Sequence, residues 1–346
     1  MNVTNRTSFA MTSAQLKSPR VSVCMPAHNA ERFVREAVES ALQQTHRNLE
    51  IICVDDGSTD GTYEILQSCE PWIQLIRTEN RGAPAARNTA LSAATGQFVQ
   101  FLDADNLLLP ESIEKKLVPL LRDEADLAFS NQVFLHDSGD IQHVRSRADP
   151  SGMDPFDYCL RFNDPGGRTA IDTNAGLHRM EVLQRIGGFR EHVVRNQDKD
   201  LAIREAAAGA RFFYVDEELS IYRDHAGPRV SKSVQSQDAL IDYWTDLIVE
   251  LQRNRVYDFS EARRSAAGHH LIRKAKILYR TQHSEAAIRG FAQAHRLSGS
   301  MPTDESSTYR FLRSVVGYPR TEKLRAMASS LVGGITRPFP SWRNLF

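Results

Sequence analysis

The stretch EIICVDDGSTDGTYEIL (residues 50–66) decides the fold of this 346-residue chain. It contains the apolar run IICV, then a polar turn with two glycines, then the start of a helical pattern. Two adjacent acids, Asp55 and Asp56, follow the apolar run directly. The order strand, loop, helix predicts part of a βαβ unit, with acidic side chains at the carboxyl end of a buried strand.

The same order recurs on both sides of this stretch. Strand patterns occur at residues 21–25, 50–54, 73–76 and 97–102, and helix patterns at 33–42, 65–66 and 84–94. Strands that alternate with helices predict an α/β fold with a central, mostly parallel sheet and helices on both faces. Ligands bind beyond the carboxyl ends of such strands. The loops at 26–29, 55–61 and 103–106 are therefore expected to converge on one crevice.

The chain divides by pattern into three regions. Residues 1–19 predict a disordered tail, residues 20–236 an α/β domain, and residues 237–346 a helical appendage. Lys plus Arg and Asp plus Glu number 43 each in the whole chain, but the helical region has 17 basic and 10 acidic residues. This excess of basic residues suits contact with an anionic membrane surface. The alternatives are an ordinary solvated helix surface, packing on the first domain, or dimer formation, so the oligomeric state stays open.

Composition excludes several classes of protein. A hydrophobic content of 41% excludes global disorder, and no stretch offers the roughly 20 apolar residues of a membrane span. The N-terminus lacks the apolar region of a Sec signal peptide. None of the four cysteines forms a CxxC pair, so we expect reduced thiols. These features predict a cytoplasmic protein, with peripheral contact at the inner membrane face as an option and no nucleic-acid partner.

The loop after the strand at 97–102 carries the strongest chemical signal. Asp103 and Asp105, two residues apart, can reach one divalent ion, and their hard oxygen atoms favour Mg²⁺ or Mn²⁺ shared with substrate phosphates. Asp55 and Asp56 offer carboxylates to a nucleobase N–H, although a capped turn also explains much of their loop. His28 places a flat ring in the same expected crevice.

These motifs together resemble those of the family 2 glycosyltransferases, which have the GT-A fold, a Rossmann-like α/β fold for nucleotide-diphospho-sugar transfer. VSVCMPAHN, EIICVDDGSTDGT and NRGAPAARNTALSAATGQFVQFLDADN occur in the order and spacing of that family. Later segments extend the resemblance to about residue 236: GGF at 187–189, QDKDL at 197–201 and YRDH at 222–225. The helical region lies outside the resemblance.

The resemblance implies a role for each matching residue. The donor is expected to contact Pro26, His28, Asn29, Asp55, Asp56, Arg87, Asp103 and Ala104. A divalent cation, Mn²⁺ or Mg²⁺, is expected on Asp103, Asp105 and His225, where it neutralises the leaving diphosphate. Asp198 matches the general base that takes the proton of the acceptor hydroxyl. The implied reaction is a single displacement that inverts the anomeric carbon.

The chain departs from the family pattern near the expected base. Gln197 stands where the family usually has Glu, and Asn106 stands where a third acid is common. Asp200 is a second candidate for the base, although residues two apart on a helix do not share a face.

Two further regions are assigned from the sequence. Asn174 and Gln197, with residues 166–168, are expected to shape an acceptor pocket. The segment 223–232 is expected to be either a lid anchored by Arg229 and Lys232 or an ordinary surface loop.

Three functions fit these observations. The first is an inverting glycosyltransferase that uses a nucleoside-diphosphate sugar, by default a UDP-sugar, and a glycan, lipid-linked or other acceptor. The second is a degenerate nucleotide-sugar binding module, which Gln197 favours. The third is a sugar-phosphate nucleotidylyltransferase, but PAHN (residues 26–29) is not the Gly-rich basic loop of those enzymes. The sugar, the acceptor and the linkage stay open.

Overall fold

The computed structural model describes residues 18–144, 152–161, 171–225, 237–281 and 283–298. The chain forms two compact units, one up to Lys232 and one from Ser233. Several expected features lie outside the described residues: nearly all of the tail at 1–19, residues 166–168, Arg229, Lys232 and the region beyond 298.

The first unit alternates strands and helices. In chain order its elements are β1 (Val21–Ala27), α1 (Val34–Leu42), β2 (Leu49–Asp56), α2 (Thr62–Gln67), β3 (Gln74–Thr78), α3 (Ala83–Ala93), β4 (Phe98–Phe101), β5 (Leu107–Leu108), α4 (Ser112–Leu121), β6 (Leu127–His136), β7 (Ile141–Val144), α5 (Pro155–Arg161), β8 (Gly176–Arg179), α6 (Met180–Arg185), α7 (Gln197–Ala207) and β9 (Phe212–Asp224).

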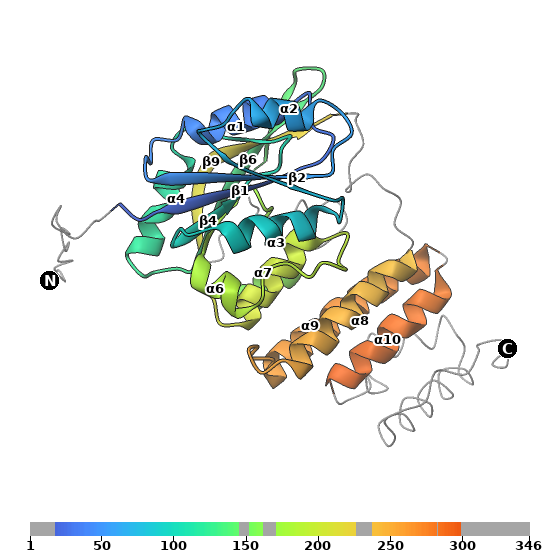
Figure 1. Cartoon of the computed structure of the whole chain (residues 1–346). Coiled ribbons are helices and arrows are strands. Elements are labelled where there is room, and N and C mark those ends of the chain that lie inside the picture. Colours follow the sequence, from blue (N-terminus) through green and yellow to red (C-terminus); the bar gives the residue numbers. More distant parts are fainter. Residues whose placement is uncertain (1–17, 145–151, 162–170, 226–236, 282, 299–346) are drawn as a thin grey trace, which may run out of the picture. The chain divides into compact units, whose positions relative to one another are not determined.

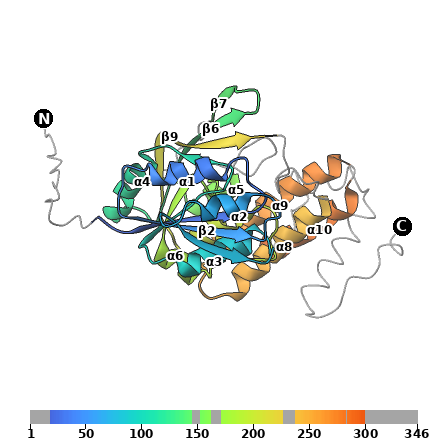
Figure 2. The ribbon, with the colours of Figure 1, turned by 45° about the horizontal axis from the view of Figure 1, so that its top comes forward.

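These strands form a single nine-stranded sheet in the order β3-β2-β1-β4-β8-β6-β9-β5, with β7 paired to β6. β1 runs parallel to β2 and β4, and β2 runs parallel to β3, so their carboxyl ends share one edge. β8 lies antiparallel between β4 and β6, and β6 runs parallel to β9. The first half of the sheet is parallel, as expected, and the second half is mixed. Figure 2 shows the β6–β7 hairpin projecting from the sheet.

Helices cover both faces of the parallel strands. In Figure 1, α1 and α2 lie on one face and α3 lies on the other. α1 buries Val34, Ala37, Val38 and Ala41 in the hydrophobic core. α3 packs on β1 and β2 through buried alanines, whose small side chains let the helix approach the sheet closely. All four cysteines are buried free thiols, and burial raises the pKa of Cys24.

The second unit contains α8 (Gln237–Arg253), α9 (Glu261–Arg280) and α10 (Ser284–Ser298). The apolar side chains of α8 are largely buried, including those of Trp244, Leu247, Ile248 and Leu251. None of the described helices combines the length and the apolar composition that a membrane span needs.

Candidate active site

The loops that follow β1 and β2 are joined by hydrogen bonds between main chain and side chains. Asn29 N donates to Ser58 Oγ (3.1 Å), and Thr59 N donates to Asn29 Oδ1 (2.9 Å). Ala30 N donates to Thr62 Oγ1 (2.7 Å). Asn29 has a left-handed backbone (φ 49°), which asparagine tolerates better than most residues. The two loops therefore form one connected surface beyond the parallel strands.

Both acids at the end of β2 are buried and already bonded within the protein. Asp56 Oδ1 accepts from Arg81 N (3.0 Å) and Thr78 Oγ1 (3.2 Å), and Oδ2 accepts from Gly82 N (2.8 Å). Asp55 Oδ1 accepts from Ser58 N (3.3 Å), and Arg77 Nε forms an ion pair with Oδ2 at 3.2 Å. The two carboxylates therefore shape the surrounding loops, whatever else they contact.

His28 presents an exposed ring beside these acids. Its Nδ1 lies 2.9 Å from the main-chain oxygen of Asp56, and Asn80 Nδ2 lies 3.1 Å from its Nε2. The backbone of Asn80 also explains Gly57, which has φ 69°, because a Cβ on that glycine would lie 2.8 Å from Asn80 N. The sequence analysis did not identify Asn80. These contacts fix the orientation of a ring that is free to stack on a planar ligand.

Arg87 joins the end of β4 to the start of α7. It lies on α3 and is buried, at 6% exposure. Its Nη2 donates to Asp103 Oδ1 (2.5 Å), and its Nη1 donates to Gln197 Oε1 (2.5 Å). Phe189 covers the guanidinium, with its ring centre 5.3 Å from Cζ. Arg87 Nε is buried without a hydrogen-bond partner in the described part of the chain.

Asn174 holds Asp103 from the other side. Its Oδ1 accepts from Asp103 N (2.7 Å), and its Nδ2 lies 3.2 Å from Asp103 Oδ2. Asp172 Oδ1 accepts from the main-chain N (2.8 Å) and from Nδ2 (2.5 Å) of Asn174. Burial, and then the charges of Asp103 and Asp198, raise the pKa of Asp172 to about 7. Asp172 is thus a third acid near Asp103 and Asp198, and the sequence analysis missed it.

Asp105 faces His225, which follows β9. His225 Nε2 lies 3.2 Å from Asp105 Oδ2, and its ring packs on Phe33 with centroids 4.6 Å apart. Arg223 lies on the same aromatic ring, 5.4 Å from its centre, and forms an ion pair with Glu36. The expected pairing of the late histidine with the DxD loop is therefore present as a direct contact.

The first turn of α7 separates the two candidate bases. Asp198 is partly exposed, and burial lowers the pKa of the neighbouring Lys199, against the opposing effect of the Asp198 charge. Asp200 is only 1% exposed and forms ion pairs with Arg190 and with Arg204 Nε (2.7 Å). Asp200 therefore anchors the helix, whereas Asp198 lies near enough to Asp172 for its charge to raise the pKa of that acid.

The structure places most of the expected residues at one edge of the sheet. Pro26 lies buried within β1, and Ala104 is 6% exposed. Asn174 and Gln197, expected in an acceptor pocket, contact Asp103 and Arg87 directly, and their role toward an acceptor stays a prediction. The sequence patterns did not identify Asp172, because its part in the site depends on burial and on the charges of Asp103 and Asp198, which lie elsewhere in the sequence.

Comparison with known proteins identifies the first unit. Residues 22–186 match the family model for glycosyl transferase family 2. The chain is 33% identical over 120 residues to the Escherichia coli UDP-Glc:alpha-D-GlcNAc-diphosphoundecaprenol beta-1,3-glucosyltransferase WfgD. The aligned region covers 34% of this chain and 47% of that protein. It is 42% identical over 106 residues to E. coli chondroitin synthase, which covers 30% of this chain and 16% of that protein. The chain therefore spans about half, or less, of the length of these relatives.

Among solved structures, the chain is similar to residues 1–349 of S. aureus TarS in complex with UDP-GlcNAc. The TM-score is 0.64 at 19% sequence identity, over 92% of this chain and 93% of that one. This likeness concerns the fold. Residues 22–186 therefore match glycosyl transferase family 2, and the first unit has an α/β fold of the GT-A type.

Proposed function

We propose that this chain is an inverting glycosyltransferase that moves a sugar from a nucleoside-diphosphate sugar to an acceptor hydroxyl. The observation that carries the proposal is the junction at Arg87, whose buried guanidinium joins Asp103 to Gln197, the neighbour of Asp198. A leaving diphosphate needs positive charge, and an attacking hydroxyl needs a base. This junction brings together, at one edge of the sheet, the buried Arg87 guanidinium, the DxD loop and the start of α7, which carries Asp198.

Arg87 is the residue that we assign to the donor phosphates. Its guanidinium carries a permanent charge, and the Asp103 carboxylate is its one anionic contact among the described ion pairs. The buried Nε, without a partner in the described residues, supports a further anionic ligand at this position. Phe189 and Gln197 hold the side chain in place, so that its charge acts from a fixed position.

Asp103, Asp105 and His225 would hold a divalent cation. The described residues contain no ready-made cluster of three or more His, Cys, Asp or Glu side chains for a metal ion. Two carboxylates in one loop, with His225 Nε2 3.2 Å from Asp105 Oδ2, fit instead an ion that takes its other ligands from substrate phosphates. When bound, such an ion neutralises charge on the leaving diphosphate.

Asp198 is the general base of the proposal. It lies in the first turn of α7, where the helix dipole favours the ionised carboxylate. It takes the proton of the acceptor hydroxyl while the acceptor oxygen bonds to the anomeric carbon and the bond to the diphosphate breaks. Attack from the face opposite the leaving group inverts the anomeric configuration. The change from Glu to Gln at position 197 leaves Asp198 in place as the base. The Gln197 amide oxygen accepts a hydrogen bond from Arg87, as a glutamate carboxylate could do at the same position.

A UDP-sugar is the first donor to test, because the name of the E. coli relative at 33% identity specifies UDP-Glc. The same name specifies a diphosphoundecaprenol-linked acceptor, so we propose a lipid-linked or glycan acceptor here. His28 is the residue that we assign to stacking on the nucleobase. Asp55 and Asp56, at the end of β2 beside His28, complete the assigned nucleobase site.

Peripheral membrane contact through the helical unit is a separate part of the proposal. The basic residues of this unit that could supply the charge are Arg263, Arg264, Arg273, Lys274, Lys276 and Arg280. Lys274 is buried at 6% exposure, and Arg263 lies 3.5 Å from Asp258 with its side chain 12% exposed. The basic surface is therefore smaller than the sequence suggested. Salt-sensitive co-sedimentation with anionic liposomes tests it, and no binding at low salt rejects it.

Thermal shift with UDP, GDP, dTDP and CDP, each with Mn²⁺, Mg²⁺ or EDTA, tests donor binding. A ligand at one hundred times its Kd stabilises the folded state by about 2.7 kcal/mol. We expect one nucleotide to give a shift that EDTA removes. A folded protein that responds to no nucleotide under any metal condition overturns the proposal.

Asp105→Asn is the variant that tests the cation assignment. It removes carboxylate charge beside His225 and should abolish the metal-dependent part of the nucleotide shift. Glu39→Gln, an exposed acid on α1, makes the same chemical change away from the site and should leave the shift unaltered. Binding without transfer to any acceptor would instead favour the degenerate binding module.

A further inference from the structure

The antiparallel pairing of β4 with β8 is short and opens toward the site. It joins Phe98 to Arg179, Val99 to His178 and Gln100 to Leu177, and beyond these pairs the two segments of the backbone diverge. On the β4 side the chain continues to Asp103, and on the β8 side the divergent residues are Asn174 and Ala175. We call this place, formed by residues 100–103 and 174–176, the fork.

Two buried side chains donate hydrogen bonds to the main chain at the fork. Gln100 Nε2 donates to the carbonyls of Phe101 (2.7 Å) and Asn174 (3.0 Å). Lys116 Nζ, from α4, donates to Gln100 Oε1 (2.6 Å) and lies 3.4 Å from the carbonyl of Ala175. Gln100 and Lys116 are both 0% exposed. Carbonyl groups beyond the end of the strand pairing are thus satisfied by side chains, as buried main-chain groups require.

The fork also sets the position of Asp103. Gln100 holds the carbonyl of Asn174, and the side chain of Asn174 bonds to the N–H and the carboxylate of Asp103. A continuous chain of hydrogen bonds therefore runs from the ammonium group of Lys116 through Gln100 and Asn174 to the first acid of the DxD loop.

Lysine is an unusual residue for the buried end of this series of hydrogen bonds. A buried ammonium group loses its hydration, and no ion pair among the described residues includes Lys116. Burial lowers the pKa of Lys116 to about 7. An apolar side chain of similar length would fill the space without this desolvation, but it would donate no hydrogen bond to Gln100. Packing alone therefore does not explain the lysine.

We propose that Lys116 is a positioning residue for the donor site, which acts through Gln100 and Asn174 to hold the Asp103 carboxylate in the orientation that binds the cation and the diphosphate. This inference rests on the proposed function. Loss of the ammonium group leaves Gln100 Oε1 without its donor and releases one side of the fork. Mutation of a residue that hydrogen-bonds to a metal ligand and orients it typically lowers metal affinity by about 10- to 100-fold.

Lys116→Met is the test, with Lys115→Met as the matched control. Lys115 is the next residue of the same helix, and it points outward, where it pairs with Glu111 (2.7 Å) and Glu217. The measurement is the Kd of the wild-type and variant full chains for UDP, or for whichever nucleotide the panel identifies, by titration calorimetry with Mn²⁺ and with EDTA. We expect Lys116→Met to weaken binding about tenfold with Mn²⁺ and to match the wild type in EDTA, where binding is weak or lost in both, while Lys115→Met matches the wild type in both conditions.

These readouts separate positioning from mere loss of folded protein. Partial unfolding lowers the number of binding sites in the titration and leaves Kd unaltered, so that result overturns the inference. If Lys116→Met does not fold, Lys116→Gln replaces it, because its shorter amide keeps a donor without a buried charge. We expect an intermediate Kd with Mn²⁺, and wild-type affinity overturns the inference. A wild-type chain that binds no nucleotide overturns the proposed function as well, whereas a defect-free Lys116 variant overturns this inference alone.

Discussion

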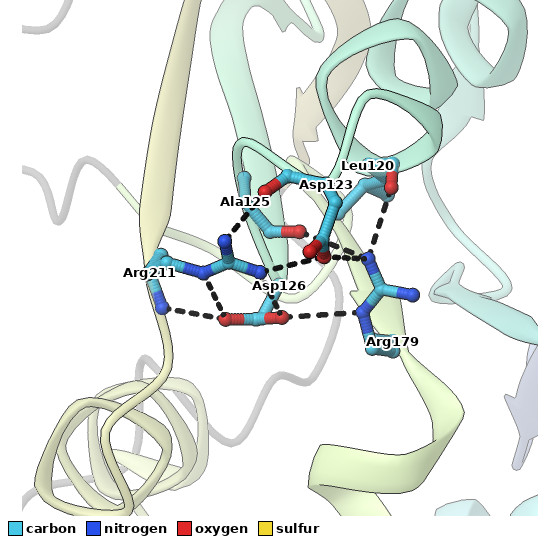
Figure 3. A network of polar contacts seen from close by, with 6 residues as sticks. All are labelled: Leu120, Asp123, Ala125, Asp126, Arg179 and Arg211. Carbon is cyan, nitrogen blue, oxygen red and sulfur yellow. Dashed lines mark hydrogen bonds and ion pairs between the residues drawn. The ribbon is translucent and has the colours of Figure 1, made fainter.

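Asp126 and Asp103 lie at opposite edges of the same sheet, and each bonds to arginine, but their surroundings differ. Asp126 lies between two arginines (Figure 3). Arg211 donates to both of its carboxylate oxygens, through Nε (3.0 Å) and Nη2 (3.1 Å), and Arg179 Nε donates at 3.2 Å. Burial alone would raise the pKa of Asp126, but the hydrogen bonds from Arg211 and the charges of both arginines lower it.

The network around Asp103 is less complete. Arg87 has one carboxylate and one amide as partners, and its Nε has no partner within the described residues. Asp172 lies close enough to the charges of Asp103 and Asp198 that, with burial, its pKa rises to about 7. Acid–acid repulsion and an unused donor persist only where other contacts hold the groups in place.

The difference supports the proposal that the network around Asp103 receives a ligand. At the Asp126 edge the protein supplies both charges and most of the hydrogen bonds, so the arrangement contributes to stability alone. At the Asp103 edge a cation and a diphosphate would relieve the repulsion among the acids and engage Arg87. Substitutions at the two edges should therefore separate stability from activity.

The largest expected effect is on Asp198. Asp198→Asn keeps the shape and removes the base, and a positioned base contributes about 10²- to 10⁴-fold to the rate. We expect kcat for transfer to fall by this factor while the unfolding temperature stays near that of the wild type. Asp200→Asn is the contrasting variant, because Arg190 and Arg204 lose their shared carboxylate charge and stability falls. Full transfer activity in Asp198→Asn would remove the base assignment.

Substitutions at the Asp126 edge should lower the free energy of unfolding rather than the activity. Asp126→Ala leaves Arg179 and Arg211 without their shared carboxylate and should lower the free energy of unfolding by about 1.5 to 3 kcal/mol. Urea unfolding measures this, and KM for the donor should not change at temperatures where the variant is folded. Asp123→Asn removes a carboxylate that is 79% exposed in the same network, and asparagine also tolerates the left-handed backbone of this position (φ 55°), so it should cost less than about 1 kcal/mol. Equal losses in the two variants would contradict the role of burial.

Lys116 should make stability depend on pH between about 7 and 10.5. In this window the unfolded chain carries a proton that the folded chain has released, because the pKa of Lys116 falls from 10.5 to about 7 on folding. The free energy of unfolding should therefore rise with pH, by at most about 1.4 kcal/mol per pH unit from this group. Below pH 7 both states are protonated and the contribution is flat. Urea unfolding at pH 7 and pH 8.5 measures the slope, and Lys116→Met should reduce it; an identical slope in that variant would refute the assignment.

Gln197→Glu should give the smallest effect. A second carboxylate on Arg87 makes the site more like the closed network around Asp126, and it adds negative charge near the expected diphosphate. We expect nucleotide affinity to weaken by about 1 kcal/mol, or roughly fivefold. Gln184→Glu makes the same change on an exposed position of α6 and should have no effect. Tighter binding in Gln197→Glu would show that Arg87 is not a phosphate contact.

Local sequence patterns located the parallel half of the sheet and its loops, because each strand and helix there has its own clear periodicity. β8 was harder to see, since its four residues lead directly into α6 and a helical pattern dominates the region. The role of Asp200 was within reach, because Arg204 lies four residues later on the same helix face.

Lys116 and Asp172 were not accessible in this way. A lysine in an amphipathic helix normally indicates the solvent face, and only the three-dimensional packing of α4 against the fork reverses that expectation. Asp172 owes its raised pKa first to burial and then to the charges of Asp103 and Asp198, which lie far away in sequence. Residues that act through such distant contacts carry little local signal.

The antiparallel pairing of β5 with β9 has a consequence for synthesis of the chain. It joins Leu107 to Ile221 and brings His225 to Asp105 across more than 100 residues. At roughly 5 to 20 residues per second, His225 is translated about 6 to 24 s after Asp105. The DxD loop therefore lacks its histidine partner throughout this interval of translation. A ribosome that stalls before β9 would hold a chain that has the loops assigned to the donor but not the histidine of the proposed cation site, so the nascent chain should not yet bind a nucleotide in a metal-dependent way.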